Sequence, residues 1–206
     1  MKVLEIRMTS KIYVSGKIIK RYVIPKEQID ELNTEYEKNR ENLSSDSSKL
    51  AGRIDSEKSV IPIIQSCKIY NTLTKNMGDY IMSLNNFDLS KDPMFNTNIL
   101  SCWINDMKPG EYNPPHTHHD TTGWSTVLFL KVPKTINDAK HKHKFRDGQL
   151  GFIFDGHTTK YFTPEVGHFY IFEASHQHFV MPYKSVENEI RRSMSFNFIR
   201  HRVEDQ

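Results

Sequence analysis

The sequence predicts a mainly β protein, a β-sandwich or barrel with a strand-and-helix N-terminal part packed on it. From Asn98 onward, short apolar runs alternate with turn residues, which is typical of many short strands. Upstream of that point the apolar residues recur at helical spacing. The chain has 206 residues, 37% hydrophobic and 26% charged, as expected for a globular domain. We expect residues 1–95 to form the N-terminal part and residues 96–206 the β core, together making one integrated domain.

The N-terminal part should contain strands followed by two helices. Residues 3–24 alternate like strand, with a turn pair at Ser15-Gly16. Pro25 stands where a first helix could begin, and an apolar stripe follows at helical spacing. A second amphipathic helix is predicted from the stripe Ile63, Cys67, Tyr70, Thr74, Met77, Ile81 and Leu84.

The β core is predicted from seven apolar runs separated by turn signals such as Lys108-Pro-Gly110 and Asp155-Gly156. The runs are 99–104, 126–132, 150–154, 160–162, 168–172, 178–181 and 192–199.

Histidines gather in the β core: nine of the ten lie between His116 and His178. In an extended segment alternate side chains share a face, so His116, His118 and Asp120 are expected on one side. His178 opens a later strand that enters a proline turn and offers a distant ligand. Imidazole and carboxylate groups together suit a divalent transition metal and leave coordination positions open for chemistry.

Near the C-terminus, an arginine begins a polar strand face. Arg191, Ser193, Ser195 and Asn197 alternate along one side of the strand, while Arg192 points to the other side, toward solvent or an outer layer. A buried polar face needs partners, and a dicarboxylate would provide one because guanidinium grips a carboxylate through two hydrogen bonds. A structural ion pair between arginine and an acidic residue is the alternative explanation.

Charge and composition limit the class of protein. A net charge of +3 and a pI of about 8.7 are too weak to argue for nucleic acid. Two cysteines in unrelated contexts favour reduced thiols in a cytoplasm, and the charged N-terminus lacks a signal-peptide core. No apolar run approaches the ~20 residues that span a bilayer. We therefore expect a soluble cytoplasmic protein.

Several motifs, taken in order, resemble the iron(II)/2-oxoglutarate-dependent oxygenases. They are Trp103-Ile-Asn105, Glu111-Tyr-Asn-Pro-Pro-His-Thr-His118, Gly167 before Phe169-Tyr-Ile-Phe172, His178-Phe-Val-Met-Pro182 and Arg191-Arg-Ser-Met-Ser-Phe-Asn197. The chain is most similar to prolyl-hydroxylase-like members from phage and marine bacterial genomes, and Leu50–Glu57 matches a stretch of those proteins. A phage-encoded member would work in the host cytoplasm.

This resemblance implies a double-stranded β-helix, a jelly-roll or cupin-like barrel, with Fe(II) and 2-oxoglutarate as cofactor and co-substrate. O2 would be the oxidant and ascorbate an optional reductant. The family's ligands are His-x-Asp/Glu and a distant His, with a basic residue that binds 2-oxoglutarate. Two registers fit: His116/His118/His178, or His118/Asp120/His178. Arg191 would bind the far carboxylate of 2-oxoglutarate, and Ser193 would add a hydrogen bond.

The implied activity is hydroxylation of a substrate with release of succinate and CO2. The substrate is open between a protein side chain, a nucleobase and a small molecule, and a homo-oligomer is allowed. One alternative is a cupin-like metal enzyme with three histidines, which also suit zinc. Another is a non-catalytic β-sandwich, such as a virion or scaffold component.

Overall fold

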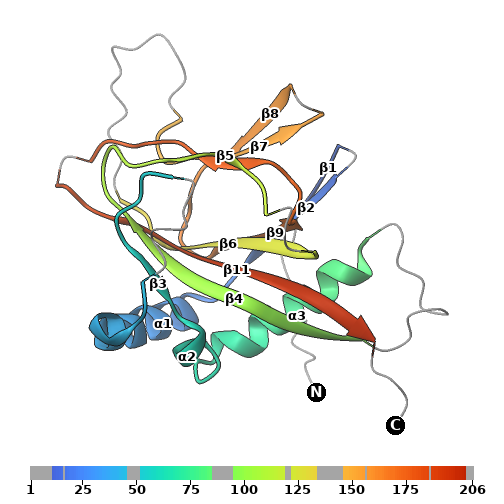
Figure 1. The fold of residues 1–206 in the computed structure, drawn as a ribbon, viewed down its shortest axis with the longest axis horizontal. Helices are drawn as coiled ribbons and strands as arrows, with labels where there is room; N and C mark the ends of the chain where they lie inside the picture. Colours follow the sequence, from blue (N-terminus) through green and yellow to red (C-terminus); the bar gives the residue numbers. More distant parts are fainter. Residues whose placement is uncertain are drawn as a thin grey trace, which may run out of the picture.

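The computed structural model describes residues 11–15, 17–45, 52–84, 95–118, 122–133, 146–155, 157–185 and 187–202. Within them the chain forms two antiparallel sheets, with helices on the outer side of the larger one (Figure 1). The major sheet has the strand order β1-β2-β9-β6-β11-β4-β3 and the minor sheet the order β5-β10-β7-β8. The expectation of a mainly β protein with flanking helices is confirmed.

The major sheet consists of β1 (Lys11–Ser15), β2 (Lys17–Val23), β3 (Glu57–Ser59), β4 (Phe95–Met107), β6 (Trp124–Lys131), β9 (His168–Glu173) and β11 (Arg191–Arg202). The minor sheet consists of β5 (Asn113–His116), β7 (Leu150–Phe154), β8 (Thr158–Phe162) and β10 (His178–Val180). Because β2 pairs with β9 and β3 with β4, the major sheet contains strands from both sides of residue 95.

The first helix, α1 (Lys26–Asn39), begins directly after Pro25 and buries Ile29, Leu32 and Tyr36, as the apolar stripe predicts. A 3-10 turn, η1 (Arg40–Asn42), continues it. The second stripe predicts one continuous helix, and that prediction is wrong. The structure has a short α2 (Ile61–Ile64) and a separate α3 (Ile69–Met82).

The interruption between α2 and α3 has a local cause. The Ser66 hydroxyl donates to the Ile63 carbonyl at 2.8 Å, and the Cys67 N–H donates to the Ile64 carbonyl at 3.2 Å. Such short-range hydrogen bonds compete with the regular helical pattern. After the break the buried face of α3 is centred on Ile69, Leu73, Met77 and Tyr80, and not on the Tyr70 and Thr74 of the predicted stripe.

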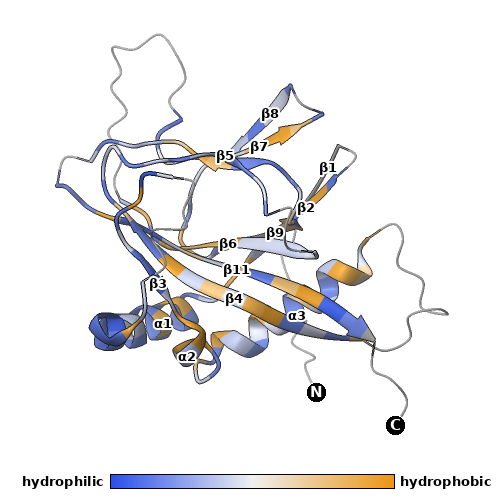
Figure 2. Cartoon of the chain, in the orientation of Figure 1, coloured by the Kyte–Doolittle hydropathy of each residue, from blue (hydrophilic) through white to orange (hydrophobic). Residues whose placement is uncertain are grey.

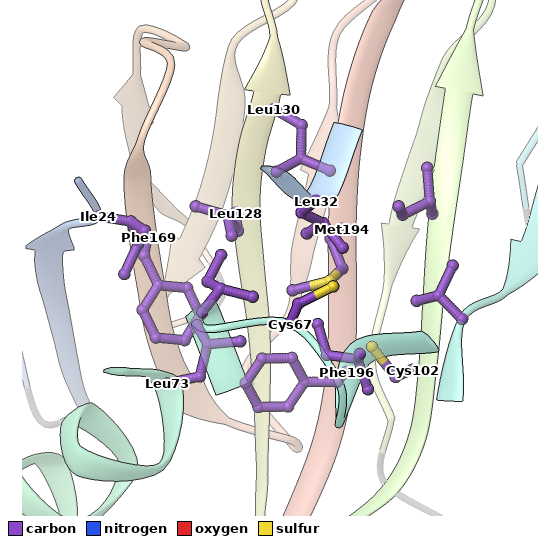
Figure 3. Packing of buried hydrophobic residues seen from close by; sticks show 14 of the residues in the cluster. Ile24, Leu32, Cys67, Leu73, Cys102, Leu128, Leu130, Phe169, Met194 and Phe196 are labelled. Carbon is purple, nitrogen blue, oxygen red and sulfur yellow. The ribbon is translucent and has the colours of Figure 1, made fainter. Parts of the chain in front are cut away.

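Strand alternation divides the core into two layers. One set of side chains on β6 and β9 packs against the helices, and Figure 3 shows Leu128, Phe169 and Met194 in this layer with Leu32 and Leu73. The alternate side chains, including Phe129 and Phe172, pack between the two sheets. Strands buried on both faces read as nearly continuous apolar runs, which is why residues 126–132 and 168–172 stand out in the sequence. Figure 2 shows α1 largely hydrophilic and hydrophobic bands along β4 and β11.

Arg192 fastens α1 to the outer face of the major sheet. Its side chain is fully buried and donates through Nε and Nη2 to the Asp106 carboxylate, with Nη2 at 2.8 Å from Oδ2. Nη1 reaches Asn33 Oδ1 at 3.2 Å and Glu37 Oε1 at 2.8 Å, both on α1. Burial alone would lower the pKa of Arg192, but the hydrogen bonds and charges of Asp106 and Glu37 raise it. The sequence predicts that Arg192 points toward solvent or toward an outer layer, and in the structure it points toward the outer helical layer.

In the described part of the chain, no helix is long and apolar enough to cross a membrane.

Replacing Asp106 by asparagine should destabilise the fold by about 3 kcal/mol, because a buried guanidinium loses its bidentate anion. The exposed pair Lys108–Asp55, at 3.1 Å, supplies the matched control: Asp55→Asn should cost less than ~1 kcal/mol. Urea unfolding of both variants measures the difference. Equal losses would show that Arg192 does not depend on Asp106.

Candidate metal centre

Three histidines converge between the sheets at the end of β5. His116 closes β5 and is the cross-strand partner of His178, the first residue of β10. His118 follows two residues after His116. One ring nitrogen from each of these three residues lies within 4.8 Å of the others. The ring centroids are 4.2 Å apart for His116 and His178, and 5.3 Å from each of these to His118.

The two strand histidines are oriented by backbone carbonyls. His116 Nδ1 lies 2.8 Å from the Pro114 carbonyl, and His178 Nδ1 lies 2.9 Å from the His176 carbonyl. A carbonyl only accepts hydrogen bonds, so each Nδ1 carries the proton and each Nε2 keeps its lone pair. Burial lowers the pKa of His116, and it holds that of His178 well below the usual range. Both effects favour the neutral imidazole that binds a metal.

The backbone around the histidines is held from several directions. The His118 N–H donates to the Ala174 carbonyl at 2.7 Å, which ties the segment after β5 to the end of β9. Next to His178, the Phe179 ring lies directly over Gly151, where an added Cβ would come within 2.2 Å of it. Pro114 and Pro115 lie on β5, an edge strand of the minor sheet, which is where proline is tolerated within a sheet.

Arg191 lies in the same cavity and has unsatisfied donors. It is 2% exposed, and its guanidinium lies 4.8 Å from the Phe129 ring centroid. Nη1 is 3.5 Å from Ser193 Oγ, while Nε and Nη2 have no hydrogen-bond partner among the residues that the structure describes. Burial lowers the pKa of Arg191 to about 10, so the side chain remains charged at neutral pH. A buried cation with free donors calls for an anion.

The cavity between these groups has a volume of about 230 Å³. Its described lining contains the three histidines and Arg191 but no aspartate or glutamate, so its charge is positive. The remaining lining residues are neutral polar or apolar: Ile54, Trp103, Asn105, Asn113, Thr117, Ser125, Thr126, Val127, Leu150, Val180, Ser193 and Ser195. A divalent metal at the histidines and a dicarboxylate reaching Arg191 fit this donor set.

The structure thus brings together His116, His118, His178, Arg191 and Ser193 of the predicted site residues. Asp120, the alternative ligand, lies outside the described residues, as do His119, His141 and His143. His176 is fully buried against Phe152 and Phe154 and does not line the cavity. His157 and His201 are exposed, as expected of residues in a turn and near the terminus.

Sequence reasoning missed several residues that line the cavity. Trp103 lies with its ring centroid 6.0 Å from that of His118, and Ile54 reaches the cavity from the segment before β3. Trp103 belongs to one of the motifs that resemble the oxygenase family, but the sequence does not indicate that it lines the cavity. Nothing in the local sequence around Ile54 signals a cavity residue, since its place depends on a long-range contact.

Comparison with known families agrees with the motifs. Residues 101–197 match a family model described as Putative 2OG-Fe(II) oxygenase. The match covers β4 to β11, including all three histidines and Arg191. The predicted resemblance to this family is confirmed, and its enzymes use Fe(II) and 2-oxoglutarate. A search of curated proteins finds no significant match.

Solved structures of prolyl hydroxylases share the fold. A Pseudomonas putida prolyl-4-hydroxylase is similar with a TM-score of 0.58 and 16% identity, covering 91% of this chain and 93% of that one. A Trichoplax adhaerens prolyl hydroxylase, in complex with a hypoxia-inducible-factor peptide, has a TM-score of 0.57 and 14% identity, covering 87% and 83%. The viral collagen prolyl hydroxylase of Paramecium bursaria Chlorella virus-1 has a TM-score of 0.56 and 13% identity, covering 89% and 96%. The expected jelly-roll fold is confirmed.

Replacing His118 or His178 by alanine should weaken Fe(II) or Co(II) binding more than about a hundredfold, since even indirect partners of metal ligands contribute 10- to 100-fold. His157→Ala, in an exposed turn, is the control and should bind as the wild type does. Anaerobic titration monitored by metal analysis measures all three affinities. Retained binding in either site variant would place the metal elsewhere.

Proposed function

We propose that this chain is an Fe(II)- and 2-oxoglutarate-dependent dioxygenase that hydroxylates a C–H bond of its substrate and releases succinate and CO2. The observation that supports it most is one cavity lined by three histidines and by a buried arginine whose Nε and Nη2 have no hydrogen-bond partner among the described residues. The family match and the jelly-roll fold support the same activity.

In this proposal His116, His118 and His178 hold the iron through their ring nitrogens, leaving further coordination positions open. Arg191 binds the far carboxylate of 2-oxoglutarate through Nε and Nη2, and Ser193 adds its hydroxyl from the neighbouring position on β11. The iron and 2-oxoglutarate, when bound, would activate O2, with two of the four electrons for its reduction coming from the decarboxylation of 2-oxoglutarate and two from the substrate C–H bond. The protein's part is to bind, orient and exclude water.

Water exclusion comes from the apolar part of the cavity. Val127, Leu150 and Val180 line it, and Phe129 covers one side of the Arg191 guanidinium. In such a poorly solvated site, charge interactions are stronger than in water. The carboxylate of a bound dicarboxylate would therefore be held firmly by a single arginine, which agrees with Arg191 having no acidic partner among the described residues.

The fold suggests which class of substrate should be tested first. The three similar structures described above are prolyl hydroxylases, one with a bound peptide, so a prolyl residue in a peptide is the first substrate to try. A nucleobase or a small molecule stays open, and mass spectrometry for added oxygen would identify either.

A metal enzyme of another kind is the second candidate, and the three-histidine donor set favours it. Three imidazoles without a carboxylate also suit zinc or a cupin-like dioxygenase. Tight metal binding that does not respond to 2-oxoglutarate would support this candidate over the oxygenase.

The identity of the third ligand can be tested directly. In the proposed set, His116→Ala should abolish tight Fe(II) binding, while Asp120→Asn should retain it within about threefold, because it changes no ligand. The opposite pattern would move the site to His118, Asp120 and His178. A carboxylate there would cancel one more positive charge of the iron.

Turnover tests the role of Arg191. Arg191→Met keeps the length and removes the charge, so it should raise the 2-oxoglutarate Kd about a hundredfold, equivalent to losing one buried charged partner. The exposed Arg146, which stacks on Tyr161, gives the control Arg146→Met. Calorimetric titration of the Mn(II)-loaded protein with 2-oxoglutarate measures the Kd, and succinate formation with Fe(II) and ascorbate measures turnover. A wild-type protein that neither binds 2-oxoglutarate nor forms succinate would refute the proposal.

A further inference from the structure

The pairing of β11 alone does not hold the backbone of Arg191 firmly in place. Arg191 is the first residue of β11 and follows the connection that runs from Tyr183 to Ile190. Strand ends are where pairing is weakest and local opening costs least. A side chain that must meet a small carboxylate needs its backbone fixed to within about 0.5 Å. A contact outside the strand pairing must therefore fix the backbone of Arg191.

The contacts of the Arg191 guanidinium do not fix its orientation. Arg192, the next residue, is held by Asp106, Glu37 and Asn33. Within the described part of the chain, the Arg191 guanidinium has the 3.5 Å contact with Ser193 and the face of the Phe129 ring, and neither sets a direction firmly. The orientation of the Arg191 side chain therefore depends on the position of the Arg191 backbone.

Tyr183 holds that backbone. Its hydroxyl accepts a hydrogen bond from the Arg191 N–H at 3.0 Å. The same oxygen lies 2.7 Å from the Met107 carbonyl and 2.8 Å from the Glu189 carbonyl, which share its single proton. Burial raises the pKa of Tyr183 to about 12, so the hydroxyl keeps its proton and serves as donor and acceptor together. One atom thus joins the start of β11, the end of β4 and the residues before Arg191.

Packing fixes the Tyr183 ring in turn. Tyr183 is 2% exposed and clusters with Ile54 and Met107. Gly148 stands beside it with φ +63°, where an added Cβ would lie 3.6 Å from both Tyr183 Cβ and Arg191 Cδ. The Gly148 N–H donates to the Pro182 carbonyl at 3.1 Å, and the Gly110 N–H to the Tyr183 carbonyl at 2.9 Å. The hydroxyl therefore has a defined place from which to hold Arg191.

We infer that Tyr183 is a positioning residue for the anion-binding arginine: its hydroxyl sets the backbone of Arg191 and so the place where the guanidinium meets the far carboxylate of 2-oxoglutarate. The inference rests on the proposed function. It adds to the site a residue that does not line the cavity and acts only through Arg191.

Tyr183→Phe removes the hydroxyl and keeps the ring. Binding of 2-oxoglutarate to the Mn(II)-loaded protein, measured by calorimetry, should weaken about tenfold, the effect of ~1.4 kcal/mol. Binding of Mn(II) itself should stay within about twofold. The competitor 2-oxobutyrate, which has the same 2-oxo acid end but no far carboxylate, should also bind within about twofold of its wild-type affinity.

Tyr80→Phe is the matched control. Tyr80 is fully buried, and its hydroxyl also donates to a backbone carbonyl, that of Ile18 at 2.9 Å. It lies on α3, on the other side of the major sheet from the cavity. This variant loses a comparable buried hydrogen bond, and its 2-oxoglutarate affinity should be unchanged.

A double-mutant cycle separates positioning from a general loss of structure. In an Arg191→Met background, Tyr183→Phe should change the 2-oxoglutarate affinity less than about twofold, because the residue through which it acts is gone. The inference is wrong if Tyr183→Phe binds 2-oxoglutarate as the wild type does. It is also wrong if the tenfold loss persists with Arg191→Met or extends equally to 2-oxobutyrate. A wild-type protein that binds Mn(II) but no 2-oxoglutarate would overturn the proposed function itself, and this inference with it.

Discussion

The alternation of side chains along β11 is the constraint on which the rest of the structure depends. This strand lies between β6 and β4 in the major sheet, and its two faces meet different surroundings. Arg191, Ser193 and Ser195 point into the cavity between the sheets. Met194, Phe196 and Phe198 point into the core beneath the helices. One strand therefore supplies the polar wall of the site and the apolar base of the helical layer.

Two consecutive arginines show that the register of β11 determines which side chains face the cavity. Arg191 and Arg192 are both buried and both charged, yet one faces a cavity without acidic residues in its described lining and the other faces Asp106. A slip of one residue in strand register would exchange them and move phenylalanines into the site. The buried ion pair of Arg192 thus contributes to register as well as to stability, and the register in turn presents Arg191 to the cavity.

Much of this could be predicted from the sequence, because alternation and spacing are local properties. They predicted the β core, α1 and the shared face of Arg191 and Ser193. For the histidines they predicted a shared face of His116, His118 and Asp120 with His178 as a distant partner, and left the choice between His116 and Asp120 open. Contacts between distant segments could not be predicted in the same way. The hydroxyl of Tyr183, for example, meets three backbone groups that no pattern connects. The break before α3 is local, but it depends on hydrogen bonds of Ser66 and Cys67 that an apolar stripe does not reveal.

The two ends of the cavity belong to different sheets, and this determines what the site can bind. His116 and His178 lie on the minor sheet, whereas Arg191 lies on the major sheet. Their separation is therefore set by the aromatic layer between the sheets. The Phe172 and Phe152 rings lie 4.7 and 6.0 Å from that of His178, and Phe129 contacts the guanidinium of Arg191. Because such cores are close-packed and deform little, these rings would set the length of the dicarboxylate that fits the proposed site.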